Sequence, residues 1–147
     1  MNDTRRTLNE LLVNLFNNIL AIEEANLQNQ HVSLSMTEVH ILEAIEKSES
    51  NMMSAVAKYL MITQGTLTVS VSKLEKKGYV ERIKDESDRR IVRLKNTEKA
   101  NMVLQVHDDF HKQMIDKIVN DLDIEEEQEL LKSLYKVSQF FKESYGN

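Results

Sequence analysis

Two arginines directly follow a short turn-forming segment of this chain. Residues 85–88 read Asp-Glu-Ser-Asp, which favours a tight turn, and Arg89 and Arg90 come next. A guanidinium at the tip of a projecting turn can enter the minor groove of A·T-rich duplex DNA, where the potential is most negative. Asp88 can hold one of these arginines by a charge-assisted pair and so organise the turn. The alternative is a surface cluster of ion pairs that contributes little.

Small or polar side chains occupy one face of a helix predicted over residues 63–77. Leu67, Val71 and Leu74 give this helix a buried stripe. The opposite face can enter a major groove, where Gln pairs with adenine and Thr meets a thymine methyl or a phosphate; otherwise it is an ordinary polar face. Because no Arg lies on it, an A·T-rich target is favoured. The DNA-contact residues predicted from this helix and the turn are Thr63, Gln64, Gly65, Thr66, Thr68, Val69, Ser72, Lys73, Lys84, Arg89 and Arg90.

The charge distribution supports a nucleic-acid partner although the net charge is −5. Between Lys58 and Lys95 the chain carries ten basic and five acidic residues, a local charge of +5, so the remainder carries −10. A basic region on an acidic body is what phosphate neutralisation requires, because only the contacting face releases counterions. The alternative is a solvated surface of mixed charge.

Four histidines offer a second kind of chemistry. His107 and His111 stand one helical turn apart, and His40, Glu23 or Glu24 can supply a partner. We interpret His40, His107 and His111 as the lining of an effector pocket, with no cofactor. The alternative is a zinc site, because zinc accepts imidazole and carboxylate ligands.

Other functional classes are disfavoured. The absence of Cys excludes disulfides, thiolate metal sites and thiol redox chemistry. There is no Gly-rich phosphate loop and no Ser in a nucleophile-elbow context, so an enzyme is not expected. No apolar run is long enough to cross a bilayer, and the N-terminus does not read as a signal peptide, so we expect a cytoplasmic protein without membrane contact.

The elements that must position these residues form a winged helix-turn-helix over residues 35–96. Ser35 and Glu38 match a helix-starting capping box, and Thr63 is a good N-cap for the polar-faced helix. Gly78 suits the position after this helix, where the chain adopts the left-handed conformation. Two β-prone runs, 79–84 and 91–95, flank the charged turn and predict a hairpin.

Long amphipathic helices are predicted on both sides of this unit, over residues 5–30 and 97–145. Their apolar residues recur at three- and four-residue spacing, and a small winged domain does not need them for its own core. A second copy of the chain is the simplest partner for these stripes, although they could instead fold back within a monomer. The sequence therefore predicts a single mainly α domain, 1–147, with a small β-hairpin wing and terminal dimerisation helices.

The chain resembles the MarR family of bacterial winged-helix transcriptional regulators. The similarity extends over the whole chain and is clearest in residues 74–82 (LEKKGYVER), 85–90 (DESDRR) and 97–99 (TEK). It implies an intertwined homodimer whose two heads meet successive major grooves of a palindromic site. It also implies that Arg89 or Arg90 is the minor-groove residue. The chain departs from the family pattern at a turn and a helix start, with Glu86, Asn96 and Ala100 in place of the usual Pro, Leu and Gly.

A narrower similarity concerns the regulated genes. Residues 16–24 (FNNILAIEE), 65–68 (GTLT) and the spacing of His107, Phe110 and His111 are similar to the branch that represses fatty-acid-synthesis genes in Firmicutes. In that branch acylated acyl carrier protein strengthens DNA binding. Zinc-responsive members of the same family use a histidine on the second helix and a pair on the fifth.

These observations predict a homodimeric repressor that binds a palindromic, A·T-rich operator on double-stranded DNA, with acylated acyl carrier protein as corepressor. One alternative within this class is a zinc-responsive repressor. An alternative from a different class is a winged-helix module that binds proteins and never contacts DNA. The basic region between Lys58 and Lys95 argues against the second alternative.

Overall fold

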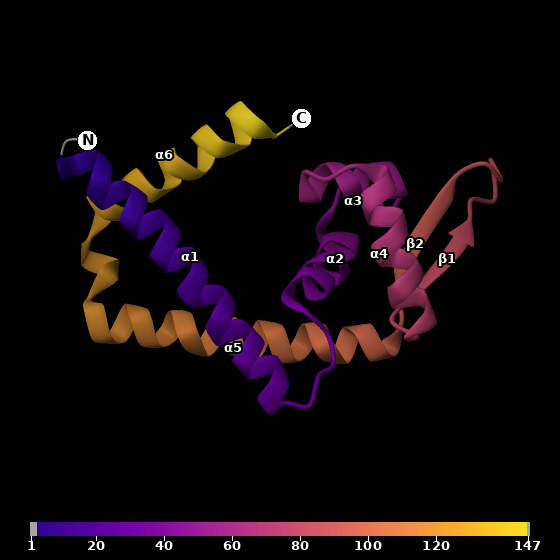
Figure 1. Ribbon diagram of the computed structural model, residues 1–147, viewed down its shortest axis with the longest axis horizontal. Helices are drawn as coiled ribbons and strands as arrows, with labels where there is room; N and C mark the ends of the chain where they lie inside the picture. Colours follow the sequence, from indigo (N-terminus) through magenta and orange to yellow (C-terminus); the bar gives the residue numbers. More distant parts are fainter. Residues whose placement is uncertain (1–2, 147) are drawn as a thin grey trace.

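The computed structural model describes residues 3–146, which form six α-helices, a short 3₁₀ turn and one β-hairpin. Figure 1 shows a head formed by α2, α3, α4 and the hairpin, and a frame of long helices formed by α1, α5 and α6. The predicted mainly α fold with a hairpin wing is confirmed. The elements are α1 (Asp3–Asn29), α2 (Met36–Lys47), α3 (Met53–Leu60), α4 (Gln64–Lys76), β1 (Val80–Lys84), β2 (Val92–Asn96), α5 (Glu98–Leu122), a 3₁₀ turn (Ile124–Glu126) and α6 (Gln128–Tyr145).

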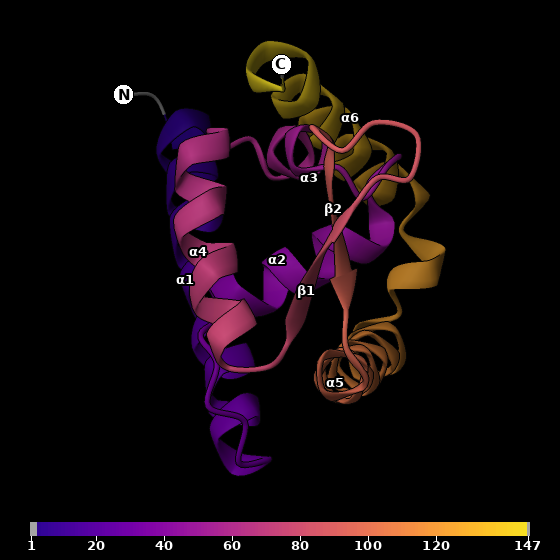
Figure 2. The same cartoon turned by 90° about the vertical axis from the view of Figure 1, so that its right-hand side faces the viewer.

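A core of aliphatic side chains holds the head together. The predicted stripe of α4, Leu67, Val71 and Leu74, is completely buried, and it packs with Val39 and Leu42 of α2. Burying each such side chain stabilises the fold by roughly 2 kcal/mol. Figure 2 looks onto the outer side of this head, where α4 and the hairpin lie beside one another.

The hairpin is antiparallel and is attached to the head through β2, near its outer end. Its register runs from Val80 opposite Asn96 to Lys84 opposite Val92. A further bridge joins Met52, just before α3, to Arg93 of β2. Because a two-stranded hairpin alone is marginally stable in water, this attachment helps to define where the wing stands.

Three predicted helix starts and one predicted helix end are confirmed. The Ser35 amide donates to the Glu38 carboxylate (2.9 Å), and the Glu38 amide donates to the Ser35 hydroxyl (3.2 Å), which completes the capping box. Thr63 and Thr97 cap α4 and α5 in the same way through their hydroxyls. Gly78 has φ of +84°, the left-handed conformation expected after α4.

The long helices leave their apolar stripes uncovered in the single chain. Leu11, Leu15 and Phe16 of α1 are each more than half exposed, and Glu23 and Leu27 are the buried residues of that helix. None of the side chains described for α6 is buried. Such surfaces are costly in water, so these helices present an apolar face that a partner can cover.

The start of the last helix differs from the prediction. Asp123, with Glu126 three residues later, predicts that this helix begins at Asp123, but Asp123 is left-handed, with φ of 51°, and a 3₁₀ turn precedes α6, which begins at Gln128. The chain reverses at this point between α5 and α6, which a helix continuing from Asp123 would not permit (Figure 1). Among residues 3–146, no helix is both long and apolar enough to cross a bilayer.

Candidate nucleic-acid interface

The outward face of α4 carries the predicted major-groove residues. Gln64, Thr66, Thr68, Val69 and Lys73 are all exposed on the side opposite the buried stripe. The exposed fraction of Val69 is 58%, which leaves its methyls available to a thymine methyl. The geometry is therefore that of a recognition helix that buries its leucines and presents mainly polar side chains outward.

The N-terminal end of α4 is open and ordered. The Thr63 hydroxyl accepts a hydrogen bond from the Thr66 amide (3.1 Å). A Cβ added to Gly65 would meet only the Thr63 hydroxyl, at 3.9 Å, so close approach of another molecule is not blocked there. The positive end of the helix dipole at this terminus favours phosphate.

Arg82 of β1 joins the hairpin to the recognition helix. Its guanidinium donates to the Ser72 hydroxyl (2.8 Å) and the Thr68 carbonyl (3.4 Å), and it lies 3.6 Å from the Glu75 carboxylate. Sequence reasoning gave Arg82 no role, because nothing local shows that β1 lies against α4. Ser72, a predicted DNA contact, is half-buried and its hydroxyl also donates to the Thr68 carbonyl (2.9 Å). The Ser72 hydroxyl is therefore largely used within the protein.

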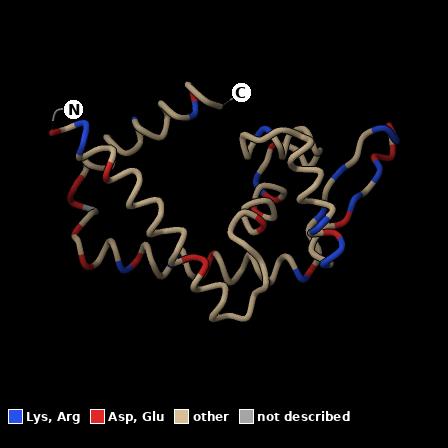
Figure 3. The backbone as a smooth tube through the Cα atoms, viewed as in Figure 1, with Lys and Arg blue, Asp and Glu red and all other residues tan. Residues whose placement is uncertain are grey.

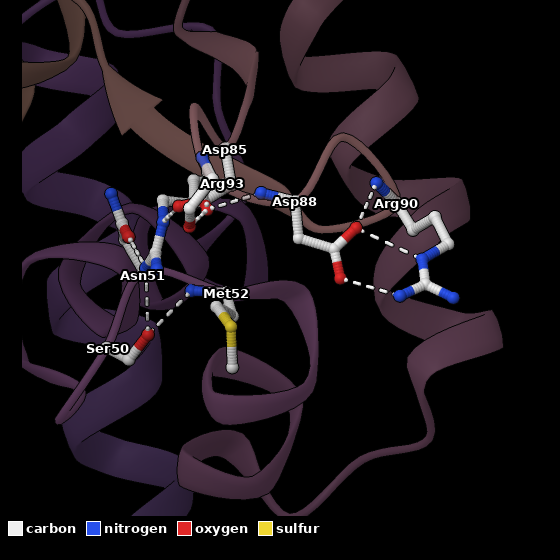
Figure 4. A network of polar contacts seen from close by, with 8 residues as sticks. Ser50, Asn51, Met52, Asp85, Asp88, Arg90 and Arg93 are labelled. Atoms are coloured by element: carbon white, nitrogen blue, oxygen red, sulfur yellow. Dashed lines mark hydrogen bonds and ion pairs between the residues drawn. The ribbon is translucent and has the colours of Figure 1, made fainter.

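The wing tip holds one arginine and leaves the other free. Asp88 receives two hydrogen bonds from the Arg90 guanidinium, at 3.1 Å from Nε and 3.0 Å from Nη2 (Figure 4). This pair holds the pKa of Asp88 below its usual range. The Arg90 side chain is nevertheless 91% exposed, so it is oriented but not covered. Arg89 is exposed, and no side chain among residues 3–146 pairs with it.

Most Lys and Arg residues of the head lie on α4 and the hairpin, where acidic residues accompany them at the turn. Figure 3 shows blue segments along the hairpin and at the foot of α4, whereas red segments are frequent in the frame of long helices. The predicted contact Lys84 is exposed at the outer end of β1, four residues before Asp88. Positive side chains therefore line the surface that also carries the recognition helix.

The predicted histidine cluster forms where α1, α2 and α5 meet. The ring centroids of His107 and His111 are 4.4 Å apart, and those of His40 and His107 are 6.1 Å apart. Glu23 of α1 contacts His111, with 2.5 Å between Oε1 and Nε2. Glu24 is exposed and lies outside this group, since consecutive helical residues point about 100° apart. The sequence could not distinguish these two carboxylates.

Two sets of donor atoms in this cluster have the spacing of metal ligands. The ligand atoms of Glu23, His107 and His111 lie within 4.8 Å of one another, and so do those of His40, Glu43 and His107. Burial, with a smaller contribution from neighbouring His111, lowers the pKa of His107. A neutral imidazole of this kind can bind a metal or accept a hydrogen bond. Sequence reasoning missed Glu43, which lies one turn after His40 on α2.

The recognition helix, the clamped wing arginine and the basic surface define a winged-helix, DNA-binding transcriptional regulator. The sequence model described as "MarR family" matches residues 34–92. The HTH-type transcriptional regulator SarZ of Staphylococcus haemolyticus is 31% identical over 106 residues, which cover 71% of this chain and 69% of SarZ. The chain belongs to the MarR family. This membership confirms the predicted class, a regulator and not an enzyme.

Solved structures show the same fold over nearly the whole chain. Streptococcus pneumoniae FabT, crystallised in complex with DNA, superposes with a TM-score of 0.87 at 38% identity, covering 95% of this chain and 98% of FabT. The transcriptional regulator BldR of Sulfolobus solfataricus superposes with a TM-score of 0.69 at 29% identity, covering 93% and 96%.

Proposed function

We propose that this protein is a homodimeric repressor that binds a palindromic, A·T-rich operator, and that it acts in the cytoplasm. The observation that carries the proposal is the pairing of an exposed recognition face on α4 with the Asp88–Arg90 clamp on the wing. In this arrangement α4 enters a major groove and Arg90 or Arg89 enters the adjoining minor groove. The similarity to FabT, whose structure was determined with DNA, supports this reading.

The dimer is formed by the uncovered stripes of α1, α5 and α6. A twofold arrangement buries the same apolar patch on both copies and spaces the two heads for half-sites about one helical turn apart. Exposed Leu11, Leu15 and Phe16 on α1 and Leu134 and Phe141 on α6 are the main apolar contacts in this proposal.

The regulated genes are those of fatty-acid synthesis, and acylated acyl carrier protein is the corepressor. The support is the 38% identity with FabT over 95% of the chain, together with the residues that it shares with that branch. The histidine cluster lies between the head and the long helices, where a ligand would alter the spacing of the two heads. A ligand that binds one spacing better than the other changes DNA affinity by that difference.

A zinc-responsive repressor is the second candidate, favoured by the donor spacing around His107. Two imidazoles and the Glu23 carboxylate supply three ligand atoms within 4.8 Å, and this donor set fits zinc. A bound ion would compete with the Glu23–His111 hydrogen bond and so couple α1 to α5 differently.

A salt-titrated gel-shift assay tests DNA binding first. We expect wild-type protein to bind A·T-rich palindromic duplexes selected from a random pool, with affinity falling steeply as salt rises. Combined Arg89→Ala and Arg90→Ala changes should abolish selective binding while the dimer persists in sedimentation. A protein that binds no duplex would be a winged-helix interaction module, and unchanged affinity in the double variant would exclude the wing mechanism.

The same assay then separates the two effectors. Acylated acyl carrier protein should strengthen binding more than the unacylated carrier does, and equal effects would exclude the lipid proposal. Zinc followed by a chelator tests the second candidate, with His107→Ala as the variant and exposed His31→Ala as its control. Zinc-dependent binding that His107→Ala leaves intact would place the metal elsewhere.

A further inference from the structure

A polar network lies where the two strands of the hairpin meet the turn at its tip, and its inner residues are not among the DNA contacts described above. Arg93 of β2 donates from Nε to the Asp85 carboxylate (2.6 Å). Its Nη1 donates to Asn51 (3.1 Å) and Ser50 (3.4 Å), which belong to the loop between α2 and α3. Figure 4 shows the Arg93 guanidinium directed toward this loop, on the opposite side of the turn from Arg90.

Asp85 connects Arg93 to the turn at the wing tip. One carboxylate oxygen receives the Arg93 hydrogen bond, and the other accepts from the backbone amides of Ser87 (3.2 Å) and Asp88 (3.1 Å). The Ser87 hydroxyl also donates to this second oxygen. The hydrogen bonds from Ser87 and Arg93 hold the pKa of Asp85 far below its usual range. Asp85 therefore stays ionised wherever the protein is folded near neutral pH.

The network continues from Asp85 to the arginine at the tip. Asp88, whose amide is held by Asp85, in turn holds the Arg90 guanidinium with both carboxylate oxygens. A continuous set of hydrogen bonds thus runs from the head loop through Arg93, Asp85 and Asp88 to Arg90. The inner part is partly covered, with side-chain exposures of 36% for Arg93 and 13% for Asp85, while Arg90 stands in solvent.

We propose that Arg93 is a positioning residue for DNA binding. By joining the α2–α3 loop to the turn, it orients Arg90 relative to the recognition helix without touching DNA itself. A planar guanidinium suits this role because its rigid fork reaches two chain segments at once, which a lysine ammonium cannot do with the same geometry. This inference rests on the proposed DNA-binding function.

A double-mutant cycle between positions 93 and 90 tests the inference. Arg93→Gln should weaken binding to a duplex selected by the wild-type protein by about tenfold, since it disorders Arg90. In the Arg90→Ala background Arg93→Gln should reduce the DNA affinity by less than about twofold, because position 90 no longer carries a guanidinium to orient. Independent, multiplicative losses would overturn the proposal.

The salt dependence distinguishes positioning from direct phosphate contact. If Arg93 touched a phosphate, Arg93→Gln would lower the salt slope by about one even in the Arg90→Ala background. We expect the slopes of Arg90→Ala and of the double variant to be equal. Lys95→Gln is the matched control, since it removes one positive charge from the exposed side of the same strand.

A second variant distinguishes a loss of DNA binding from a loss of folding. Asp85→Asn keeps one carbonyl oxygen for the turn amides but places its NH2 group, a donor, against the Arg93 Nε–H, so it breaks the pair with Arg93 and should reproduce the Arg93→Gln pattern. Circular dichroism and thermal melting check that each variant is folded at the assay temperature. If wild-type protein binds no duplex, the proposed function fails; if it binds and the cycle is multiplicative, only the role of Arg93 fails.

Discussion

The Glu23 carboxylate lies 2.5 Å from Nε2 of His111, although the two residues are 88 positions apart in the sequence. This contact joins α1 to α5, and both helices also present uncovered apolar surface. Glu23 is buried, whereas the His111 side chain is 37% exposed, so one partner is accessible from solvent. A molecule that competes for His111 can therefore loosen the connection between the two helices.

The stability of the protein should depend on pH through His107. Burial lowers the pKa of His107 in the folded state below its ordinary value of 6.5, so the unfolded chain takes up a proton at higher pH than the folded one. Stability is then fully present above the ordinary value and falls as pH drops through it. We expect Tm to decrease between about pH 7.5 and 5.5, and to do so less in His107→Gln. His31→Gln is the control, and an equal decrease in both variants would contradict the assignment.

Two glycines should separate stability from DNA affinity. Gly78→Ala places a side chain at φ of +84° with no atom within 4 Å of the new Cβ, so the cost is conformational, about 1 kcal/mol. Gly65→Ala lies in the first turn of α4, where Ala is the better helix former. In urea unfolding, only Gly78→Ala should lower the free energy of unfolding. In gel shifts, only Gly65→Ala should lower the affinity for DNA. The reverse pattern would remove Gly65 from the interface.

The exposed stripe of α1 should be required for dimerisation. Leu15→Glu places a charge on the apolar face, where Leu15 is 55% exposed in the single chain. Because a twofold interface contains the change twice, we expect dimer dissociation to increase by about 100-fold or more in sedimentation. Asn14→Glu adds the same charge on the polar side of α1 and should leave the dimer intact. Dissociation by both variants would point to a general charge effect.

Asn96 should be replaceable with a gain in stability. Its amide donates to the Leu42 carbonyl (2.8 Å), but its Oδ1 is buried without a partner among the described residues. Replacing it by Leu removes an unsatisfied acceptor and adds apolar surface beside the core, so Asn96→Leu should raise the free energy of unfolding by about 1 kcal/mol. Exposed Asn101→Leu should change it by less than about half that amount. A destabilised Asn96→Leu would mean that the amide contributes more than the orphaned oxygen costs.

The sequence predicted the helices well because helix caps and the spacing of buried apolar residues depend on residues that are close together in the chain. The capping box at Ser35, the Thr63 cap and the stripe of Leu67 act within a few residues of themselves, and all three are confirmed. The start of α6 was predicted wrongly, because an Asp can cap a helix or adopt the left-handed conformation, as Asp123 does. Only the tertiary packing decides between these options.

The sequence could not predict the polar side-chain contacts between different helices and strands. Arg82 and Arg93 counted only as positive charges in the sequence, yet one binds α4 and the other binds the α2–α3 loop. These partners are 10 and 42 positions away, and no spacing rule connects such positions. Helical spacing placed His107 beside His111 on α5, but the approach of His40 and the choice of Glu23 over Glu24 depend on how α2 and α1 pack against α5.

The start of α5 is fastened to the end of the recognition helix. The Thr97 hydroxyl donates to the Gly78 carbonyl (2.7 Å), and the Lys99 ammonium donates to the Lys77 carbonyl (2.8 Å). The 25 residues of α5 make a rod about 37 Å long, and His107 lies about 15 Å along it from this joint. Pivoted at His107, a tilt of about 5° would carry the joint sideways by about 1.3 Å. Under the proposed function, a small tilt of α5 caused by a ligand among the histidines would therefore displace the end of α4, the proposed recognition helix, by about the radius of an atom.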